Sequence, residues 1–361
     1  MAAVSGVDLT LLRPHAFREG SWVRRAGARD VDEGYRTVVG RLAGKSPNRV
    51  VFLSRLKEAL DPVPDVIHVL TDENFWLTTQ VDRMARRLRP RPRLVFHTWQ
   101  NVPMSDACYP QPWHWLYRLD TRLEREVFSF AAGAAARNHE AVGVLRGRGF
   151  AGPIAHIPWG SDVGRFAFVP AREKLPDPPV IGYVGRLVRE KGIEDLRRAV
   201  EELRFPVVLR IVGDGPLAGE AAGWRLSRGR VEWIRNIPKK SIPEAYRGMD
   251  LLVLPSRTTP TWKEQFGRVL VEAMASGVPV LGSSSGAIPE VLGDAGAVFP
   301  EGDVRALART VADLLADPSR RARMSARGRE RAEKSYAWPV WAAQTAAFLG
   351  ECLGRDHAHR D

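Results

Sequence analysis

The chain has few cysteines and no long apolar run. Only Cys108 and Cys352 occur among 361 residues, so neither a disulfide framework nor a cysteine-rich metal site can form, which fits a reducing compartment. No stretch approaches the roughly 20 apolar residues that a membrane-spanning helix needs, and the start, MAAVSGVDLTLLRPH, lacks the basic-then-apolar layout of a secretory signal. We therefore expect a cytoplasmic protein, for which a peripheral contact with the inner face of the membrane stays open.

Lysine is also scarce, which changes the meaning of the net charge of +12. Of the 54 basic residues, 46 are arginine and 8 are lysine, an excess that a GC-rich coding bias produces without any binding partner. The charge is diffuse, since residues 1–160 carry 23 basic and 16 acidic residues (+7) and residues 161–361 carry 31 and 26 (+5). The densest stretches, 83–93 and 320–331, are interpreted as solvated faces. We therefore expect no specific nucleic-acid partner.

The remaining composition is globular, and the length suggests two domains. Short β-rich runs alternate with amphipathic stretches, which is the pattern of parallel sheets flanked by helices. Strands are predicted at 7–12, 66–70, 94–98, 133–136, 180–184, 207–212, 231–234, 251–254, 278–282 and 297–299. Helices are predicted at 75–88, 113–130, 139–147, 192–203, 267–276 and 336–353.

A proline-rich, aperiodic stretch at 158–179 is the best domain boundary. We expect an α/β protein with a first domain over residues 1–165, a second over 166–335, and a C-terminal helix and tail over 336–361. Two open α/β units in tandem leave a cleft at the carboxyl ends of their strands, where such folds bind ligands.

The predicted strand 180–184 leads directly into the sequence GRLVREKG. Gly185 and Arg186 lie at its end, and Lys191 lies at the start of the next helix. Two cations at a strand-to-helix turn suit a diphosphate, because the helix N-terminus adds backbone donors and a favourable dipole. A solvated basic loop explains the same spacing equally well.

A glycine-rich turn, GDGPLAG (213–219), follows the predicted strand 207–212. Gly213, Gly215 and Ala218 satisfy the dinucleotide pattern G-x-G-x-x-A, and Glu232 lies 19 residues beyond the first glycine. Pro216, however, removes an N–H group from the turn, and the motif follows the second strand of its unit rather than the first. A plain tight turn therefore stays open beside an NAD-binding turn.

The segment TWKEQFGRVLVEAMASGVPV (261–280) carries Glu264 and, eight residues later, Glu272. Apolar neighbours surround Glu272, so its carboxylate needs hydrogen-bond donors such as ribose hydroxyls. Gly267 lets the backbone approach a ligand, and the N–H groups of Gly267, Arg268 and Val269 are donors at a helix start. The alternative for Glu272 is an ion pair with Arg268 four residues earlier.

Taken together, these pieces resemble the retaining glycosyltransferases of family 4. They stand in the family's order: GR…EKG at 185–192, GDGPL at 213–217, MDLLVLPS at 249–256, E-x7-E as Glu264 to Glu272, and SGVPVLGSSSGAIPEV at 276–291. FHTWQN (96–101), ARNHEAVGVLRGRGF (136–150) and IPWGSD (157–162) are similar too. The resemblance covers roughly residues 7–350. It implies the GT-B fold, in which two Rossmann-like domains face each other across a cleft and a C-terminal helix crosses back to the first domain.

The resemblance also implies an activity. It is the transfer of a hexose from a UDP- or GDP-linked sugar, with retention of configuration and without a metal or other cofactor, to an acceptor that the sequence does not identify. Arg186 and Lys191 would neutralise the diphosphate of the leaving group. Glu264 would hold hydroxyls of the donor sugar, and the N–H groups from Phe266 to Val269 would lie near the sugar and phosphate.

Other parts of the donor site follow from the same resemblance. Glu272 would bind the ribose, and the loop at Asn236 and Ile237 would border the base. The glycines Gly185, Gly213 and Gly215 would belong to the donor-binding loops. His97 matches the first-domain histidine that family members place near the donor sugar and acceptor, and the alternative for it is a satisfied histidine at a strand end. No covalent nucleophile is assigned.

Some features depart from the family. The first predicted strand begins at residue 7, so we expect the first domain to lack the family's first strand and glycine-rich loop, which help to bind acceptor. Trp159 stands in the interdomain loop where the family often has Asn. The run Asp30-Val31-Asp32 mimics a metal-binding motif, but it lies far from a clear strand end. Two alternatives therefore remain: an NAD-dependent oxidoreductase using GDGPLA (213–218), and a catalytically impaired glycosyltransferase-like remnant.

Overall fold

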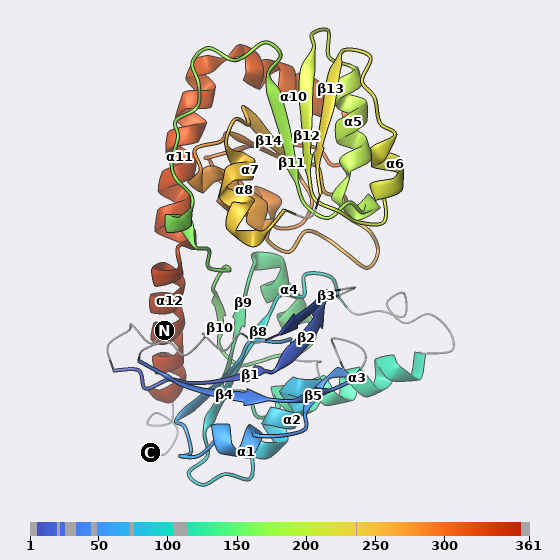
Figure 1. Cartoon of the computed structure of the whole chain (residues 1–361). Helices are drawn as coiled ribbons and strands as arrows, with labels where there is room; N and C mark the ends of the chain where they lie inside the picture. The colour runs from blue at the N-terminus through green and yellow to red at the C-terminus, as the bar shows by residue number, and fades with distance from the viewer. Residues whose placement is uncertain are drawn as a thin grey trace. The chain divides into compact units, whose positions relative to one another are not determined.

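A computed structural model describes residues 6–19, 22–25, 34–44, 49–72, 76–103, 114–235 and 237–354. The chain folds as two compact units (Figure 1). The first contains Met1–Ile157 and Ala342–Asp361, and the second contains Pro158–Trp341. The division after Ile157 falls at the start of the proline-rich stretch, eight residues before the predicted boundary of 165/166.

The second unit is built on a six-stranded parallel sheet with the order β13-β12-β11-β14-β15-β16. The strands are β11 (Val180–Val184), β12 (Val207–Val212), β13 (Gly229–Ile234), β14 (Leu251–Leu254), β15 (Val280–Ser283) and β16 (Ala297–Phe299). All six lie within two residues of their predicted bounds. Parallel strands covered on both faces are apolar along their whole length, which is why runs such as LLVL are easy to locate.

Helices cover both faces of this sheet (Figure 1). One face packs against α5 (Ile193–Glu201), α6 (Ala218–Ala222) and α10 (Val304–Ala316). The other packs against α7 (Ile242–Tyr246), α8 (Arg268–Ala275), α9 (Ile288–Leu292) and α11 (Pro318–Tyr336). Single 3-10 turns occur at η3 (Val163–Arg165), η4 (Arg189–Lys191) and η5 (Lys239–Ser241). Alternate strand residues feed the two cores, with Ile181 and Tyr183 on one side and Val180 on the other.

The first unit contains a four-stranded parallel sheet with the order β10-β9-β8-β7. Its strands are β7 (Val66–Val69), β8 (Arg93–Thr98), β9 (Gly133–Ala136) and β10 (Ile154–His156). Four described helices lie between residues 49 and 157: α1 (Leu56–Ala59), α2 (Trp76–Ala85), α3 (His114–Phe128) and α4 (His139–Gly147). Phe96, Phe128 and Phe150 form an aromatic cluster in the core, with ring centroids 5.1–6.1 Å apart.

Three strand pairs lie outside this sheet. β1 (Thr10–Pro14) pairs in parallel with β4 (Arg36–Gly40). β2 (Ala16–Glu19) pairs with β3 (Trp22–Arg25), and β5 (Leu42–Ala43) pairs with β6 (Val51–Phe52), both antiparallel. The strand predicted at 7–12 is therefore present as β1, shifted two to three residues along the chain, and its partner was not predicted. The Asp30-Val31-Asp32 run lies outside the described residues.

The last helix, α12 (Trp338–Gly354), crosses the division between the units, and its residues from Ala342 onward belong to the first unit. There it packs tightly on β9, because a Cβ atom at Gly133 would lie 2.7 Å from the Cys352 sulfur and 2.8 Å from the Phe348 ring. This confirms the expectation that the C-terminal helix returns to the first domain. Among the helices that the structure describes, none combines the length and apolar composition needed to cross a membrane.

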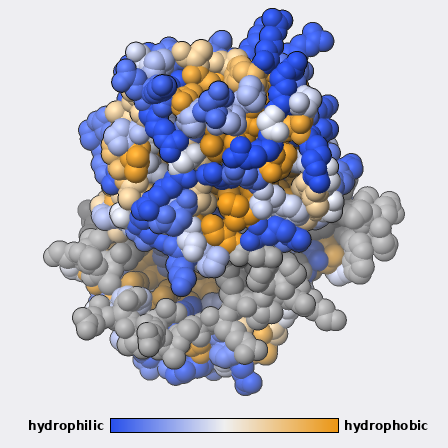
Figure 2. Space-filling view, turned by 45° about the horizontal axis from the view of Figure 1, so that its top comes forward, coloured by the Kyte–Doolittle hydropathy of each residue, from blue (hydrophilic) through white to orange (hydrophobic). Residues whose placement is uncertain are grey.

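The arginine stretch 320–331 is a solvated face only in part, since Arg323 and Arg327 are exposed but Arg321 is not. It lies in α11, where Arg321 is only 1% exposed. Arg321 donates to four backbone carbonyls, those of Leu314, Leu315, Arg172 and Glu173. Backbone carbonyls at the end of α10 need such donors, so this arginine is part of the architecture. On the surface of the second unit that Figure 2 shows, hydrophilic residues surround small groups of hydrophobic ones.

Candidate active site

The candidate site lies at the point where the strand order of the second unit reverses. The chain runs outward from β11 to β12 and β13, then returns to start again at β14 beside β11. Ligands of open α/β sheets bind outside the carboxyl ends of the strands at such a switch point. The loops that follow β11 and β14 carry Arg186, Lys191, Ser256 and Glu264, so the sequence-predicted donor residues come to this edge.

The loops after β11 and β12 lie directly against each other. The N–H group of Leu187 donates to the carbonyl of Asp214 at 2.9 Å. Gly213 has φ +146°, and a Cβ atom there would lie 1.9 Å from the Gly185 carbonyl oxygen. At Gly215 a Cβ atom would lie 2.4 Å from the Leu187 carbonyl oxygen. Both glycines of the GDG turn are therefore required by the neighbouring backbone rather than by a dinucleotide.

The acidic residue of the dinucleotide pattern is also occupied. Glu232 lies on β13, where Arg210 donates to one carboxylate oxygen at 3.0 Å and Arg230 donates to the other at 2.8 Å. These arginines lower the pKa of Glu232 against the opposing effect of burial. Both oxygens of the Glu232 carboxylate already accept hydrogen bonds from arginines, so the residue does not need ribose hydroxyls as partners. The structure therefore gives the oxidoreductase alternative no support.

Lys191 and Glu264 form the centre of the site. The Lys191 ammonium lies 2.5 Å from Oε2 of Glu264 and 4.8 Å from the centroid of the Trp262 ring. The Ser256 hydroxyl donates to the same Glu264 oxygen at 2.9 Å. The Glu264 side chain is buried and the Lys191 side chain is about one fifth exposed (21%). The pair therefore joins the loop after β11 to the loop after β14.

Arg186 differs from Lys191 in its surroundings. Its side chain is exposed, and within the described part of the chain it makes no ion pair. Its backbone carbonyl accepts a hydrogen bond from the Tyr183 hydroxyl at 2.7 Å. Burial, with a smaller effect of Glu264, raises the pKa of Tyr183, so the hydroxyl stays protonated and fixes this turn. The backbone of Arg186 is thus held while its charge is available to a ligand.

The start of α8 lies next along the chain from Glu264. Phe266 is buried and packs edge-on against Tyr336. Gly267 adopts φ +75° as the residue that starts the helix, and the first turn holds Arg268 and Val269. First-turn N–H groups have no acceptor within their own helix, so this end of α8 offers donors and the positive end of a helix dipole.

Glu272 is bonded to Tyr246 rather than to Arg268. Both possible partners are described, and the contact that the structure gives is the Tyr246 hydroxyl donating to Oε2 of Glu272 at 2.6 Å. Burial raises the pKa of Glu272, while the Tyr246 hydrogen bond and the more distant Arg268 charge oppose this. The alternative, an ion pair between Glu272 and Arg268, is therefore not formed. One carboxylate oxygen is held by Tyr246, and a ribose role is compatible with this contact.

Two further predicted residues lie in the loop after β13. Asn236 lies outside the described residues. Ile237 is partly buried and packs against the core formed with α7, α8 and α9. Its packing on the second unit gives it a fixed place in the loop that we expected to border the base.

His97 lies in the first unit, at the penultimate position of β8. Its side chain is completely buried and stacks on His68, with ring centroids 5.9 Å apart. Burial lowers the pKa of His97 well below its ordinary value, and the Arg137 and His68 charges add to this effect. His97 is therefore a neutral imidazole. The burial agrees with the alternative of a structural histidine at a strand end, and a contact with donor or acceptor stays a prediction.

The sequence predictions missed the residues that support the loops carrying Lys191 and Glu264. Ser256 was seen only as the end of MDLLVLPS, although a polar residue two positions after a buried strand could have indicated its contact with Glu264. Tyr246 and Trp262 carried no recognisable signal, because their partners lie 26 and 71 residues away in the sequence. Trp159, which replaces the usual Asn, packs edge-on against Trp338 at 5.8 Å.

Comparison with known proteins shows similarity to glycosyltransferases. Residues 166–331 match the family described as "Glycosyl transferases group 1". A GDP-mannose-dependent alpha-(1-6)-phosphatidylinositol monomannoside mannosyltransferase of Mycolicibacterium smegmatis is 37% identical over 54% of this chain and 56% of its own length. The chain thus spans about half the length of this relative. A glycogen synthase of Mycobacterium tuberculosis is 31% identical over 78% of this chain and 68% of its own length.

Solved structures agree in fold. A sucrose-phosphate synthase from Thermosynechococcus elongatus superposes with a TM-score of 0.67 at 22% identity, covering 95% of this chain and 88% of its own. HepE of Anabaena, solved in complex with UDP, gives a TM-score of 0.64 at 20% identity over 88% and 86% of the two chains. The expected GT-B class is confirmed by these glycosyltransferase neighbours. The fold, the matched region and the extent of the glycogen synthase match together show that this chain belongs to the glycosyl transferases of group 1.

Proposed function

We propose that the protein moves a hexose from a nucleotide-diphosphate sugar to an acceptor, with retention of configuration and without a metal ion. The observation that carries this proposal is the contact of Lys191 with Glu264 at the β11/β14 switch point, beside the start of α8. GDP-mannose is the first donor to test, because mannosyltransferase relatives that are 32–37% identical are described as GDP-mannose-dependent. UDP-sugars are the second, because HepE was solved with UDP.

The chemistry follows from where charge develops. As the glycosidic bond breaks, negative charge grows on the departing diphosphate, and fixed positive groups stabilise it most effectively. Arg186 carries an available charge, Lys191 adds a second when the diphosphate competes for it with Glu264, and the first turn of α8 adds N–H donors. These groups supply the positive charge that a metal ion provides in other transferases.

The carboxylates have separate roles in the proposal. Glu264, kept in place by Ser256, would accept hydrogen bonds from hydroxyls of the donor sugar, and Glu272 would do the same for the ribose. Neither is assigned as a covalent nucleophile. The acceptor would therefore attack the donor sugar on the same face from which the leaving group departs. His97 of the first unit would act, if it contacts the sugar, as a neutral hydrogen-bonding group.

For the acceptor we propose a molecule at the inner face of the membrane. The support is the description of the mannosyltransferase relatives, whose names include a phosphatidylinositol monomannoside. The net charge of +12, although diffuse and explained by coding bias, still attracts the whole chain to an anionic surface. This makes the protein a cytoplasmic enzyme with peripheral membrane contact. Binding to vesicles that contain anionic lipid should then fall steeply as salt is raised.

The test is turnover by three variants, Glu264→Gln, Arg186→Ala and Lys191→Ala, measured as nucleotide release from GDP-mannose and UDP-glucose with a panel of phosphatidylinositol-based and sugar acceptors. Each should lose about 100-fold or more in kcat/KM, since each removes a group that stabilises the transition state. Arg189→Ala is the matched control, because Arg189 is an exposed cation of the same loop. Unchanged turnover in all three variants would contradict the proposal.

Ligand binding separates the remaining alternatives. Only ligands that bind the native state raise its melting temperature, so GDP, UDP and their sugars should do so and NADH should not. Release of nucleotide by slow hydrolysis, with no transfer to any acceptor, would instead favour the catalytically impaired remnant.

A further inference from the structure

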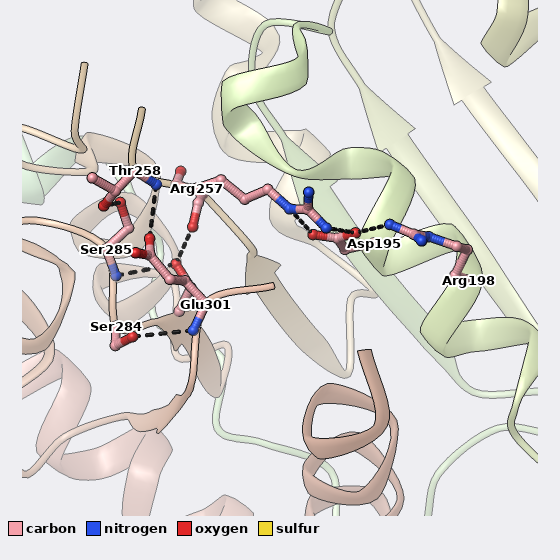
Figure 3. Close-up of polar contacts among 9 residues, drawn as sticks. Asp195, Arg198, Arg257, Thr258, Ser284, Ser285 and Glu301 are labelled. Atoms are coloured by element: carbon pink, nitrogen blue, oxygen red, sulfur yellow. Dashed lines mark hydrogen bonds and ion pairs between the residues drawn. The ribbon is translucent and has the colours of Figure 1, made fainter. Parts of the chain in front are cut away.

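An ion pair between the buried Asp195 carboxylate and the partly exposed Arg257 guanidinium joins the segment that follows Lys191 to the loop that carries Glu264. Asp195 lies in the first turn of α5 and is only 2% exposed. The Arg257 guanidinium, three residues beyond the end of β14, binds both of its oxygens, with Nη2 2.5 Å from Oδ1 and Nε bonded to Oδ2 (Figure 3). Arg198, from the next turn of α5, also binds Oδ1. Asp195 therefore has one partner on its own helix and one on the opposite loop.

The backbone of the two loops is joined at the same place. The N–H group of Arg257 donates to the carbonyl of Glu190, the residue before Lys191, at 2.8 Å. A Cβ atom at Gly192, the residue after Lys191, would lie 1.9 Å from the Pro255 carbonyl oxygen. Residues 190–192 and 255–257 are therefore in direct contact on both sides of Lys191, and Arg257 supplies both hydrogen-bonded links.

The segment around Arg257 is also tied on its other side. The N–H group of Thr258 donates to Glu301 at 2.7 Å, and the N–H group of Glu301 is bonded to the Ser284 hydroxyl at 3.1 Å (Figure 3). The hydroxyls of Thr258 and Ser285 are 3.1 Å apart. The loop after β14 thus reaches the loops after β15 and β16, and Arg257 extends this chain of contacts to α5.

The sheet itself gives little support at this point. β11 pairs with β12 along five residues, but with β14 only at Ile181↔Leu251 and Gly182↔Leu252. The structure describes residues 183–184 of β11 and 253–254 of β14, but these residues do not pair with each other. The carboxyl ends of β11 and β14 are thus not held together by strand pairing at the point where Lys191 and Glu264 must meet a common ligand.

We propose that Arg257 is the positioning residue of the donor site, which holds the Lys191 loop at a fixed spacing from Ser256 and Glu264 through its two-point contact with Asp195. The inference rests on the proposed function, since it assumes that Lys191 and Glu264 serve one nucleotide-diphosphate sugar. A rigid bidentate guanidinium suits this task, because its planar fork fixes orientation as well as distance. Small errors in the placement of binding groups cost up to about 100-fold in rate.

The experiment compares two arginines that bind the same carboxylate. Arg257→Gln removes the two-point side-chain link to Asp195 and keeps the backbone hydrogen bond to Glu190, whereas Arg198→Gln removes a partner of Asp195 within α5 and leaves the side-chain link between the loops intact. Affinity for GDP and for UDP is measured by calorimetry, and kcat and KM are measured by nucleotide release. We expect Arg257→Gln to lose at least about tenfold in affinity for the bound nucleotide and 10- to 100-fold in kcat/KM, and Arg198→Gln to stay within about twofold of the wild type.

Two further measurements separate positioning from a general loss of structure. If Arg257 acts through Lys191, then Arg257→Gln placed on Lys191→Ala should cause no additional loss of nucleotide affinity, since interacting sites are not additive. Amide hydrogen exchange without ligand should be faster in Arg257→Gln at residues 185–193 and 255–258 but unchanged in the strands of the sheet, which reports local opening.

Three results would overturn the inference: equal nucleotide affinity in Arg257→Gln and wild type, equal losses in the two glutamine variants, or a full additional loss on the Lys191→Ala background. Failure of the proposed function looks different. In that case the wild type itself binds neither GDP nor UDP, and the role of Arg257 in the donor site falls with it.

Discussion

At the scale of single residues, Asp82 is a buried carboxylate in the first unit. It lies on α2 with no exposed surface, and Arg86 donates to its Oδ2 at 2.9 Å. Oδ1 has no hydrogen-bond partner among the described residues. Burial raises the pKa of Asp82 from 3.8 to about 6, against the opposing effect of Arg86. The ionised carboxylate is therefore less favourable in the folded protein than in the unfolded chain.

This environment predicts a pH dependence of stability. Between about pH 4 and pH 6 the folded protein still holds a proton that the unfolded chain has lost, so the free energy of unfolding should fall as the pH rises through this window. One pKa unit corresponds to about 1.4 kcal/mol, which bounds the loss at about 3 kcal/mol. Urea unfolding of wild type and Asp82→Asn at pH 4 and pH 7 measures it. The variant should lose less stability between the two values, and identical pH dependence would contradict the prediction.

Residue-level prediction selected residues from local signals and overlooked contacts between distant parts of the chain, while the donor-binding roles of the selected residues stay predictions. Lys191 and Glu264 were both selected from their own loops, and the structure places them 2.5 Å apart. Asp195 and Arg257 were not selected, because neither residue type nor spacing shows that two charges 62 residues apart will form an ion pair. His97 was selected from a strand end, but its complete burial depends on packing that the sequence does not show.

At the scale of elements, prediction depended on which side chains fill the buried face. Strands buried on both sides are apolar runs, so β11, β12 and β14 were located without error, as was the apolar edge strand β16. The helix α11 was not identified because its buried residues are mostly small or polar: Arg321, Met324, Ser325, Gly328, Ala332 and Tyr336. They follow helical spacing, but a hydrophobic pattern does not reveal them. β10 was missed because its sequence, IAH, is short, ends in a polar residue and is only partly buried.

The turn between β12 and α6 provides a test at this scale. Gly213→Ala should destabilise the second unit by about 2 kcal/mol or more and weaken GDP or UDP binding, because φ +146° and a Cβ 1.9 Å from the Gly185 carbonyl force the two loops apart. Gly219→Ala is the matched control. Gly219 lies exposed within α6 with open space around it, so alanine there should stabilise by up to about 1 kcal/mol. Thermal unfolding and calorimetry measure both effects, and a destabilised control or an unaffected Gly213→Ala would refute the argument.

At the scale of the whole molecule, the two units have separate cores. The cores on both faces of the six-stranded sheet are formed entirely by residues of Pro158–Trp341, and the third core is formed by residues of the first unit. Nucleotide binding, in the proposed function, involves the second unit through Arg186, Lys191 and α8. Stability and ligand binding should therefore be separable between the units, since domains with their own cores unfold as their own cooperative blocks.

Differential scanning calorimetry tests this separation with one variant in each unit. Arg321→Ala leaves four carbonyls of the second unit without their buried donor and should cost about 3 kcal/mol, which lowers the unfolding temperature of one component by about 6–12 °C. Arg323→Ala, an exposed position of the same helix, should change it little. Asp82→Asn should shift only the unfolding transition of the first unit. GDP or UDP should raise the unfolding temperature of the second unit only, which is the transition that Arg321→Ala lowers. A single transition that all of these changes move together would show that the two units unfold as one cooperative block.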